Sequence, residues 1–185
     1  KTTKQKQLTN DIKSELEKCL AVKNRELELE TSLDRVRART MSMRKPYDLL
    51  GICEILFTEL RSMGFSELRN TMINIHDDDK GSFLNYDFSE NAGTTITTIF
   101  YNSLPAIANS VNQIRNSNDA FAEFEITGKD LDEWKDFRRK NGEQDDPRLE
   151  KISSLYYYFY SIGTGAIVIS AYSSINEEKG KALKR

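Results

Sequence analysis

The first 45 residues contain no glycine, no proline and no aromatic side chain, and this absence constrains the fold more than any other feature of the chain. Glycine and proline are the residues that interrupt helices, and large aromatic side chains fill globular cores. Every Gly, Pro, Phe, Tyr and Trp stands at or after position 46. The sequence therefore predicts one long helix over residues 1–45, not a globular domain.

A seven-residue repeat runs along this predicted helix, with Ile12 and Cys19 among the a positions and Val22 among the d positions. A helix of this kind, about 55 Å long from residue 8 to residue 44, exposes an apolar stripe that needs a second helix to cover it. We expect a parallel homodimer. The alternative is a helix that folds back on its own domain, because a second, skewed stripe is also apolar (Leu16, Leu20 and Leu27). The predicted dimerisation residues are Leu8, Ile12, Cys19, Val22, Leu29, Leu33, Val36 and Met43.

The charge divides unevenly at Pro46. Before it stand 12 Lys and Arg against 7 Asp and Glu, and from it onward 15 against 22, so the two parts carry +5 and −7. The basic residues of the helix interleave with its apolar positions, unlike a DNA-binding basic region, which precedes its zipper. The second part lacks a basic groove for nucleic acid, although Tyr156 to Tyr160 is rich in aromatic rings. No nucleic-acid partner is expected.

After Pro46 the apolar pattern changes repeatedly between helical and strand periods. This order of elements predicts an α+β domain with a central, mainly antiparallel sheet and helices on its faces. Predicted helices cover residues 47–63, 103–116, 130–140 and 176–185, and predicted strands cover 70–76, 82–88, 94–100, 120–126, 155–162 and 166–172. Gly64 is expected to cap the first of these helices, and residues 77–81 are expected to form a hairpin turn.

The junction between the two parts resembles a junction found in bacterial sensor histidine kinases. The similar segment is Leu29-Glu-Thr-Ser-Leu-Asp-Arg-Val-Arg-Ala-Arg-Thr-Met-Ser-Met43, followed by Tyr47-Asp-Leu-Leu50. In that family such a coiled helix leads into a GAF-like sensory domain. The resemblance is close over about twenty residues; the rest of the chain agrees in the order of its elements and in the hydrophobic strands near Tyr156 to Tyr172.

The resemblance implies a coiled-coil signalling helix over 1–45, a GAF-like sensory domain over 46–175 and the start of a linker helix over 176–185. It implies a non-catalytic module of a multidomain signalling protein, dimeric through its helix, that passes a change to an output domain. No ATP-binding sequence and no phosphoacceptor histidine region occur here. Any kinase activity is therefore expected outside this chain. The alternative is a purely structural dimerisation or partner-docking domain with no small-molecule ligand.

Six residues are predicted to line a small-molecule pocket, because each joins a polar tip to a position on a predicted strand or its edge. They are Asn74, His76, Tyr86, Tyr101, Tyr156 and Tyr158. The identity of the ligand is left open, and no cofactor is indicated. A small hydrolase that uses His76, the one histidine, is a further alternative, but no nucleophile elbow accompanies it.

Metal, disulfide and membrane hypotheses find little support in the sequence. Cys19 and Cys53 form no CxxC pair, and a calcium loop with Gly81 at its sixth position would place His76 and Lys80 at ligand positions. The longest apolar stretch, residues 165–171, is far shorter than the roughly 20 residues of a membrane-spanning helix. We therefore expect a cytoplasmic chain that holds no metal.

Overall fold

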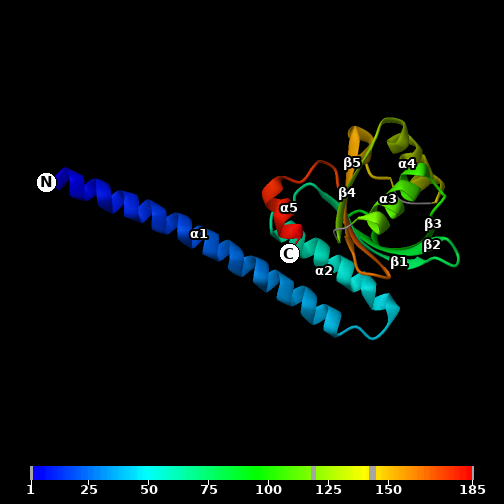
Figure 1. Ribbon diagram of the computed structural model, residues 1–185, viewed down its shortest axis with the longest axis horizontal. Helices are drawn as coiled ribbons and strands as arrows, with labels where there is room; N and C mark the ends of the chain where they lie inside the picture. The colour runs from blue at the N-terminus through cyan, green and yellow to red at the C-terminus, as the bar shows by residue number, and fades with distance from the viewer. Residues whose placement is uncertain (1, 118–119, 142–144, 185) are drawn as a thin grey trace. The chain divides into compact units, whose positions relative to one another are not determined.

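The computed structural model describes the backbone of residues 2–117, 120–141 and 145–184, and the side chains of the same ranges except those of residues 2–6, 8 and 9. The chain divides into two compact units, Lys1–Ser42 and Met43–Arg185. The fold is mixed, with one long N-terminal helix and a six-stranded antiparallel sheet in the second unit (Figure 1). The described part includes no helix with the length and apolar character that crossing a membrane requires.

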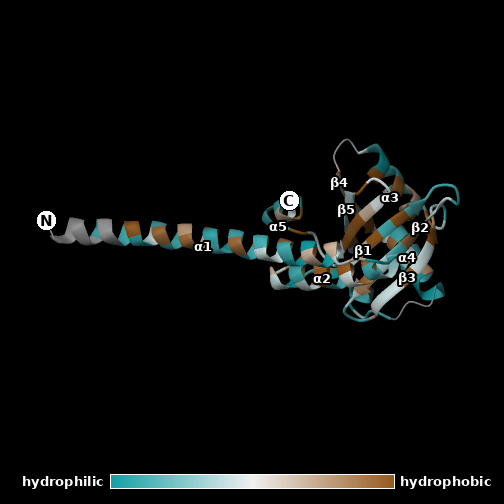
Figure 2. Ribbon diagram, turned by 90° about the horizontal axis from the view of Figure 1, so that it is seen from below, coloured by the Kyte–Doolittle hydropathy of each residue, from teal (hydrophilic) through white to brown (hydrophobic). Residues whose placement is uncertain are grey.

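Helix α1 spans Thr2–Met41, so the predicted long helix is confirmed. Its 40 residues correspond to a length of about 60 Å at the usual helical rise. Ion pairs between residues three or four apart, such as Lys18 with Glu15, run along its surface. Several apolar side chains of α1 remain exposed: Ile12, Leu16, Leu20, Val22, Leu27 and Met41. Figure 2 shows hydrophobic segments recurring along the ribbon of this helix.

The helix ends before Met43, which corrects the predicted helix end at residue 44 and takes Met43 out of the helical repeat. The reason lies in the residues that follow. The carboxylate Oδ2 of Asp48 accepts hydrogen bonds from the backbone N–H groups of Arg44 (2.6 Å) and Lys45 (2.9 Å). Lys45 is extended, with φ -135° and ψ 152°, as a residue before proline tends to be. Of the predicted dimerisation residues, Val36 is therefore the last that lies in the helix.

A short 3₁₀ turn, Pro46–Asp48, leads into α2, Leu49–Ser62. The predicted cap at Gly64 is confirmed: its φ is +89°, a conformation that disfavours other residues. Two backbone bonds close the helix end, from Gly64 N–H to Arg61 and from Phe65 N–H to Leu60.

The sheet has the order β3-β2-β1-β6-β5-β4, and all neighbouring strands are antiparallel. All six predicted strands are present. The strands are β1 Leu68–Asp77, β2 Ser82–Ser89, β3 Gly93–Phe100, β4 Phe121–Thr127, β5 Ser154–Ser161 and β6 Gly165–Ala171. At the start of β6, Gly165 is required, because an added Cβ would lie 1.9 Å from the carbonyl oxygen of Asn74.

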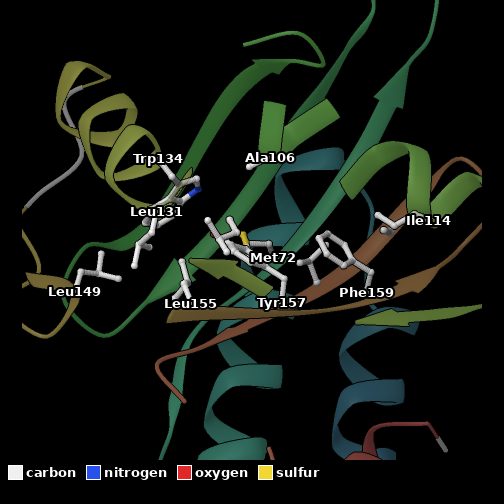
Figure 3. Packing of buried hydrophobic residues seen from close by; sticks show 12 residues of the cluster. Met72, Ala106, Ile114, Leu131, Trp134, Leu149, Leu155, Tyr157 and Phe159 are labelled. Atoms are coloured by element: carbon white, nitrogen blue, oxygen red, sulfur yellow. The ribbon is translucent and has the colours of Figure 1, made fainter. Parts of the chain in front are cut away.

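Helices cover both faces of the sheet. Helix α2 packs on one face, where Cys53 and Phe57 meet apolar residues of β1, β2, β5 and β6. Helices α3 (Pro105–Asn116) and α4 (Gly128–Lys140) pack on the other face. The 3₁₀ turn Leu149–Lys151 adds Leu149 to that second layer, and α5 (Glu177–Leu183) packs on the α2 side. Figure 3 shows the core under α3 and α4, with Met72 of β1 between Trp134 and Phe159.

Candidate ligand cavity

A cavity of about 80 Å³ lies between the sheet and helices α3 and α4. One water molecule needs roughly 10–15 Å³ on this measure, so the space exceeds an ordinary packing defect. Aromatic and aliphatic side chains form most of the wall, and some of them appear in Figure 3. The apolar lining includes Met72, Phe83, Ala106, Phe124, Trp134, Tyr157, Phe159 and Val168. Cavities of this kind, apolar with a few polar groups, are the usual form of a small-molecule site.

Strand β1 supplies polar side chains to this apolar wall. Its pairing with β6 shifts by one residue between Leu68 and Asn70, so Arg69 occupies a β-bulge. A bulge changes the direction of a side chain, and Arg69 and Asn70 both line the cavity. Asn70 has a partner at both ends of its amide: its Nδ2 donates to Asp87 (2.8 Å), and its Oδ1 accepts from the Ser170 hydroxyl.

Asn74 and Asn85 differ from Asn70 in that their side-chain oxygens have no hydrogen-bond partner in the part of the chain that the structure describes. The two residues lie directly opposite each other on β1 and β2, and both line the cavity. Each is 7% exposed, and each Oδ1 is buried with no hydrogen-bond partner among the described residues. A buried acceptor left unpaired is unfavourable by roughly 1–3 kcal/mol. Two such acceptors, side by side at one cavity wall, indicate a missing donor.

The opposite end of the cavity is built around Trp134. The guanidinium carbons of Arg69 and Arg138 lie 5.1 and 5.0 Å from the centre of its ring, in cation–π contact. Asp146, itself buried, is 3.7 Å from Nε of Arg69 and accepts a 2.6 Å hydrogen bond from the Tyr172 hydroxyl. Burial, and then this bond to Asp146, raise the pKa of Tyr172, so the phenol stays protonated and donates.

The electrostatics of the cavity follow from its walls. Among the described residues that line it there are two guanidinium groups and no carboxylate. The charge of Arg69 is balanced by Asp146 just outside the lining. A cationic ligand would meet two positive groups and no carboxylate to balance its charge. The wall therefore suits a molecule without positive charge that offers hydrogen-bond donors to Asn74 and Asn85.

A second group of polar residues lies at one end of α3, and it borders an open concavity that also includes Thr164. Arg115 contacts the carboxylate of Asp78, the hydroxyl of Tyr101 (3.1 Å) and Nδ1 of His76 (3.3 Å). The Tyr101 hydroxyl donates to Asp78 at 2.8 Å. The cluster fastens α3 to the turn between β1 and β2, and its charges are paired within it.

This cluster predicts a pH dependence of stability. Partial burial, and then the guanidinium of Arg115, lower the pKa of His76 below its usual 6.5, although Asp78 acts in the opposite direction. The unfolded chain therefore takes up a proton more readily, and stability falls as the pH drops below 6.5. We expect His76→Gln to flatten the decrease in melting temperature between pH 7.5 and 5.5.

The carboxylates provide the internal control for that measurement. Hydrogen bonds from Tyr101 and Arg115 lower the pKa of Asp78 below the usual 3.8. Partial burial raises the pKa of Glu67, but hydrogen bonds and the ion pair with Lys179 outweigh it and lower that pKa below 4.5, so both contributions are lost only in more acidic solution. The wild type and His76→Gln should converge in slope below pH 4.5. Parallel melting curves from pH 7.5 to 5.5 would show that His76 does not contribute as described.

The six residues predicted for the pocket fall into three places. Asn74 lines the cavity under α3 and α4. His76 and Tyr101 belong to the cluster at Arg115. The remaining three lie on the α2 side of the sheet: Tyr86 packs under α2, and Tyr156 and Tyr158 pack with Phe57, the Tyr158 hydroxyl accepting from the N–H of Ile175 at 2.8 Å.

Several lining residues were not among those predicted. Asn85 was missed because the predicted turn over 77–81 would pair Asn74 with Leu84, whereas in the structure Asp77 pairs with Ser82 and Asn74 pairs with Asn85. Trp134 and Arg138 stand four residues apart on a predicted helix, a spacing that puts both on one face. Arg69 had no such signal, since its direction depends on the bulge. Tyr157 and Phe159 alternate with the tyrosines that were selected and occupy the cavity face instead.

Reactive side chains lie away from this cavity. Cys53 is buried under α2, and burial, with the nearby Asp87 second, raises its pKa to about 12, so the thiol is a poor nucleophile. It donates a hydrogen bond to the backbone oxygen of Tyr86 (3.4 Å). Within residues whose placement is described, no three His, Cys, Asp or Glu side chains gather in a way that would hold a metal ion.

Comparisons of the chain with protein-family models and with curated proteins gave no match. The geometry of the cavity and the long helix are therefore the features that bear on function.

Proposed function

We propose that this chain is a non-catalytic sensory module of a multidomain bacterial signalling protein, in which a small molecule bound in the cavity under α3 and α4 alters the output of a domain elsewhere in that protein. We propose a cytoplasmic location for it. Its junction at residues 29–50 resembles that of bacterial sensor histidine kinases, and a GAF-like identity agrees with the antiparallel sheet covered on both faces. The observation that carries the proposal is the pair of buried, unpartnered oxygens of Asn74 and Asn85.

The ligand chemistry follows from the same pair. Two adjacent acceptors favour a molecule with at least two N–H or O–H donors, and the walls favour one without positive charge. The cavity volume of about 80 Å³ is smaller than the roughly 150 Å³ of an engineered cavity that accepts benzene. A compact amide, lactam or single heterocyclic ring is therefore the class we propose, with the cavity widening slightly for a ring.

Strand β1 connects the cavity on one face of the sheet with helix α2 on the other face. Its side chains alternate, so Asn74 faces the cavity while Thr71 and Ile73 face α2. The hydroxyl of Thr71 donates a 2.6 Å hydrogen bond to the carbonyl of Cys53 in α2. A shift of β1 on ligand binding would therefore move α2, which follows α1 along the chain. Coupling of this kind requires that the ligand bind one arrangement better than the other.

Dimerisation through α1 is the second part of the proposal. Ile12 and Val22, two of the exposed apolar residues on this helix, stand at an a and a d position of the seven-residue repeat. A parallel pair of α1 helices would bury these side chains and would join the two sensory domains in one dimer. The competing function is a structural dimerisation or docking domain, in which the cavity holds only water.

Thermal unfolding with small probes separates these two functions. We expect uracil, which has two N–H donors, to raise the melting temperature, and 1,3-dimethyluracil, which has none, to leave it unchanged. A ligand at 100 times its dissociation constant stabilises by about 2.7 kcal/mol, which is several degrees for a domain of this size. The probe panel extends to small lactams and amides, each beside its N-methylated analogue.

The matched variants for this experiment are Asn74→Leu and Asn85→Leu, which should abolish the response. Binding of a charged probe, or of a probe without hydrogen-bond donors, would still be consistent with a sensory function but would contradict the proposed ligand class. No response to any member of the panel would favour the structural function.

A further inference from the structure

Strand β3 forms an open edge of the sheet. In the described part of the chain it pairs with β2 alone, in register over all eight residues from Gly93 to Phe100. The backbone groups on its outer side have no strand to bond. An exposed edge of this length is a template for another strand, and proteins usually protect such edges with charges, proline or bulges.

None of those protections occurs on β3. Its sequence is Gly-Thr-Thr-Ile-Thr-Thr-Ile-Phe, with no charged residue and no proline, and its register with β2 has no bulge. The opposite edge, β4, differs, because Glu123 and Glu125 are exposed on it. If two copies of β4 paired antiparallel about Phe124, these glutamates would face each other, and like charges in that position are destabilising.

The exposed face of β3 carries two large apolar side chains, Ile96 and Phe100, beside the threonines Thr94 and Thr98. Ile96 and Phe100 are 41% and 52% exposed, on the same face as Leu84 of β2, which is 39% exposed. Ile96 and Phe100 belong to the edge strand itself, where a further strand would cover part of them, and Leu84 lies one strand farther into the sheet. A new neighbour at this edge would therefore gain backbone hydrogen bonds and apolar contact together.

The sequence of β3 fits a second copy of itself. Residues Thr94-Thr95-Ile96-Thr97-Thr98 read the same in both directions. An antiparallel pair about a two-fold axis at Ile96 places Ile96 opposite Ile96, Thr95 opposite Thr97, and Thr94 opposite Thr98. On both faces of the joined sheet, each of these residues then lies opposite one of the same type. The nearest charged residue, Glu90, lies opposite the uncharged Asn102.

We propose that two copies of this chain pair through their β3 edges, antiparallel and centred on Ile96, so that two sheets become one continuous sheet. This contact goes beyond the function proposed above and depends on neither the cavity nor α1. Five paired residues make a small interface that is weak between free molecules. If α1 also joins two chains, their high effective concentration favours the β3 contact further.

Register-specific disulfide formation tests the proposal. In full-length chains carrying Cys19→Ser to remove the exposed thiol, we expect Ile96→Cys to cross-link as a dimer under mild oxidation. Thr95→Cys and Thr97→Cys should cross-link poorly alone, because the two copies of each lie diagonally, beyond disulfide reach. When Thr95→Cys and Thr97→Cys are co-expressed, cross-linked dimer should rise at least about fivefold, since these positions face each other.

Glu123→Cys on the β4 edge is the matched control and should remain uncross-linked. Equal cross-linking of every variant would indicate random collision and overturn the register. No cross-linking at Ile96→Cys or in the co-expressed pair would overturn the contact itself. Cys53 is common to all the variants, and its burial keeps it out of the reaction.

Discussion

Replacing Asn74 with leucine is expected to leave the ligand-free domain as stable as the wild type or to stabilise it by about 1 kcal/mol. Replacing Asn70 with leucine is expected to destabilise the same domain by about 2–4 kcal/mol. The two asparagines are four residues apart on β1, both are buried, and both line the same cavity. They differ in their hydrogen bonds. The comparison therefore separates a ligand-binding polar group from a structural one.

The expected loss at Asn70 comes from the partners it would abandon. Its side chain joins the Ser170 hydroxyl to the Asp87 carboxylate, and leucine would leave both without this bond in the interior. Each buried group that loses its partner is unfavourable by roughly 1–3 kcal/mol. Asn74 has no such partner at Oδ1, so leucine there removes an unsatisfied acceptor and adds apolar surface to an apolar wall.

Chemical denaturation of both variants, with Asn85→Leu beside them, measures these differences directly. Asn85→Leu should behave as Asn74→Leu does, because the Oδ1 of Asn85 is also buried and has no hydrogen-bond partner among the described residues. Improved stability with lost binding is typical of a residue kept for function. If Asn74→Leu and Asn85→Leu each lost as much stability as Asn70→Leu, the two amides would be structural, and the main evidence for a ligand would be lost.

The second large effect is expected in α1. Val22→Glu should weaken dimerisation at least about a hundredfold, because two valine side chains, each contributing about 1.5 kcal/mol on burial, would be replaced by two carboxylates facing each other. Val22 is 58% exposed on a single chain and takes a d position of the repeat. Sedimentation equilibrium over a concentration series measures the effect.

Asn24→Glu is the matched control, since it adds the same charge two residues away, on the outer side of a paired helix. Both variants should be made with Ile96→Lys, so that pairing at the β3 edge does not hold the molecules together. We expect Asn24→Glu to dimerise as the parent does. A parent that stays monomeric at high concentration, or equal association of the two variants, would contradict the coiled-coil dimer.

Much of the fold could be predicted because it depends on local patterns. The period of two in residues 70–76 and 155–162 identified strands and separated their faces, and Gly64 marked a helix end through its need for a positive φ. The long helix followed from missing helix breakers. Its last residues did not, because the chain is drawn out of the helix by a carboxylate that stands later in the sequence, at Asp48.

The site was harder to predict because it depends on how layers meet. Alternation shows that Tyr156 and Tyr157 face opposite ways, but it does not show which face is filled and which keeps a cavity. That outcome depends on side-chain volumes contributed by α3 and α4, far along the chain. The choice of Tyr156 and Tyr158 fell on the α2 face, where Phe57 packs closely against them. Asn74 was selected for its polar tip and lies at the cavity.

The central claim, that a small donor molecule occupies the cavity and bonds to Asn74 and Asn85, is tested most directly by NMR of the asparagine side-chain amides during titration with uracil. We expect the signals of Asn74 and Asn85 to shift together and saturate with one dissociation constant, while the signal of Asn70, held by Asp87 and Ser170, moves little. Unchanged signals from Asn74 and Asn85 at saturating probe, or shifts confined to exposed asparagines, would contradict the account.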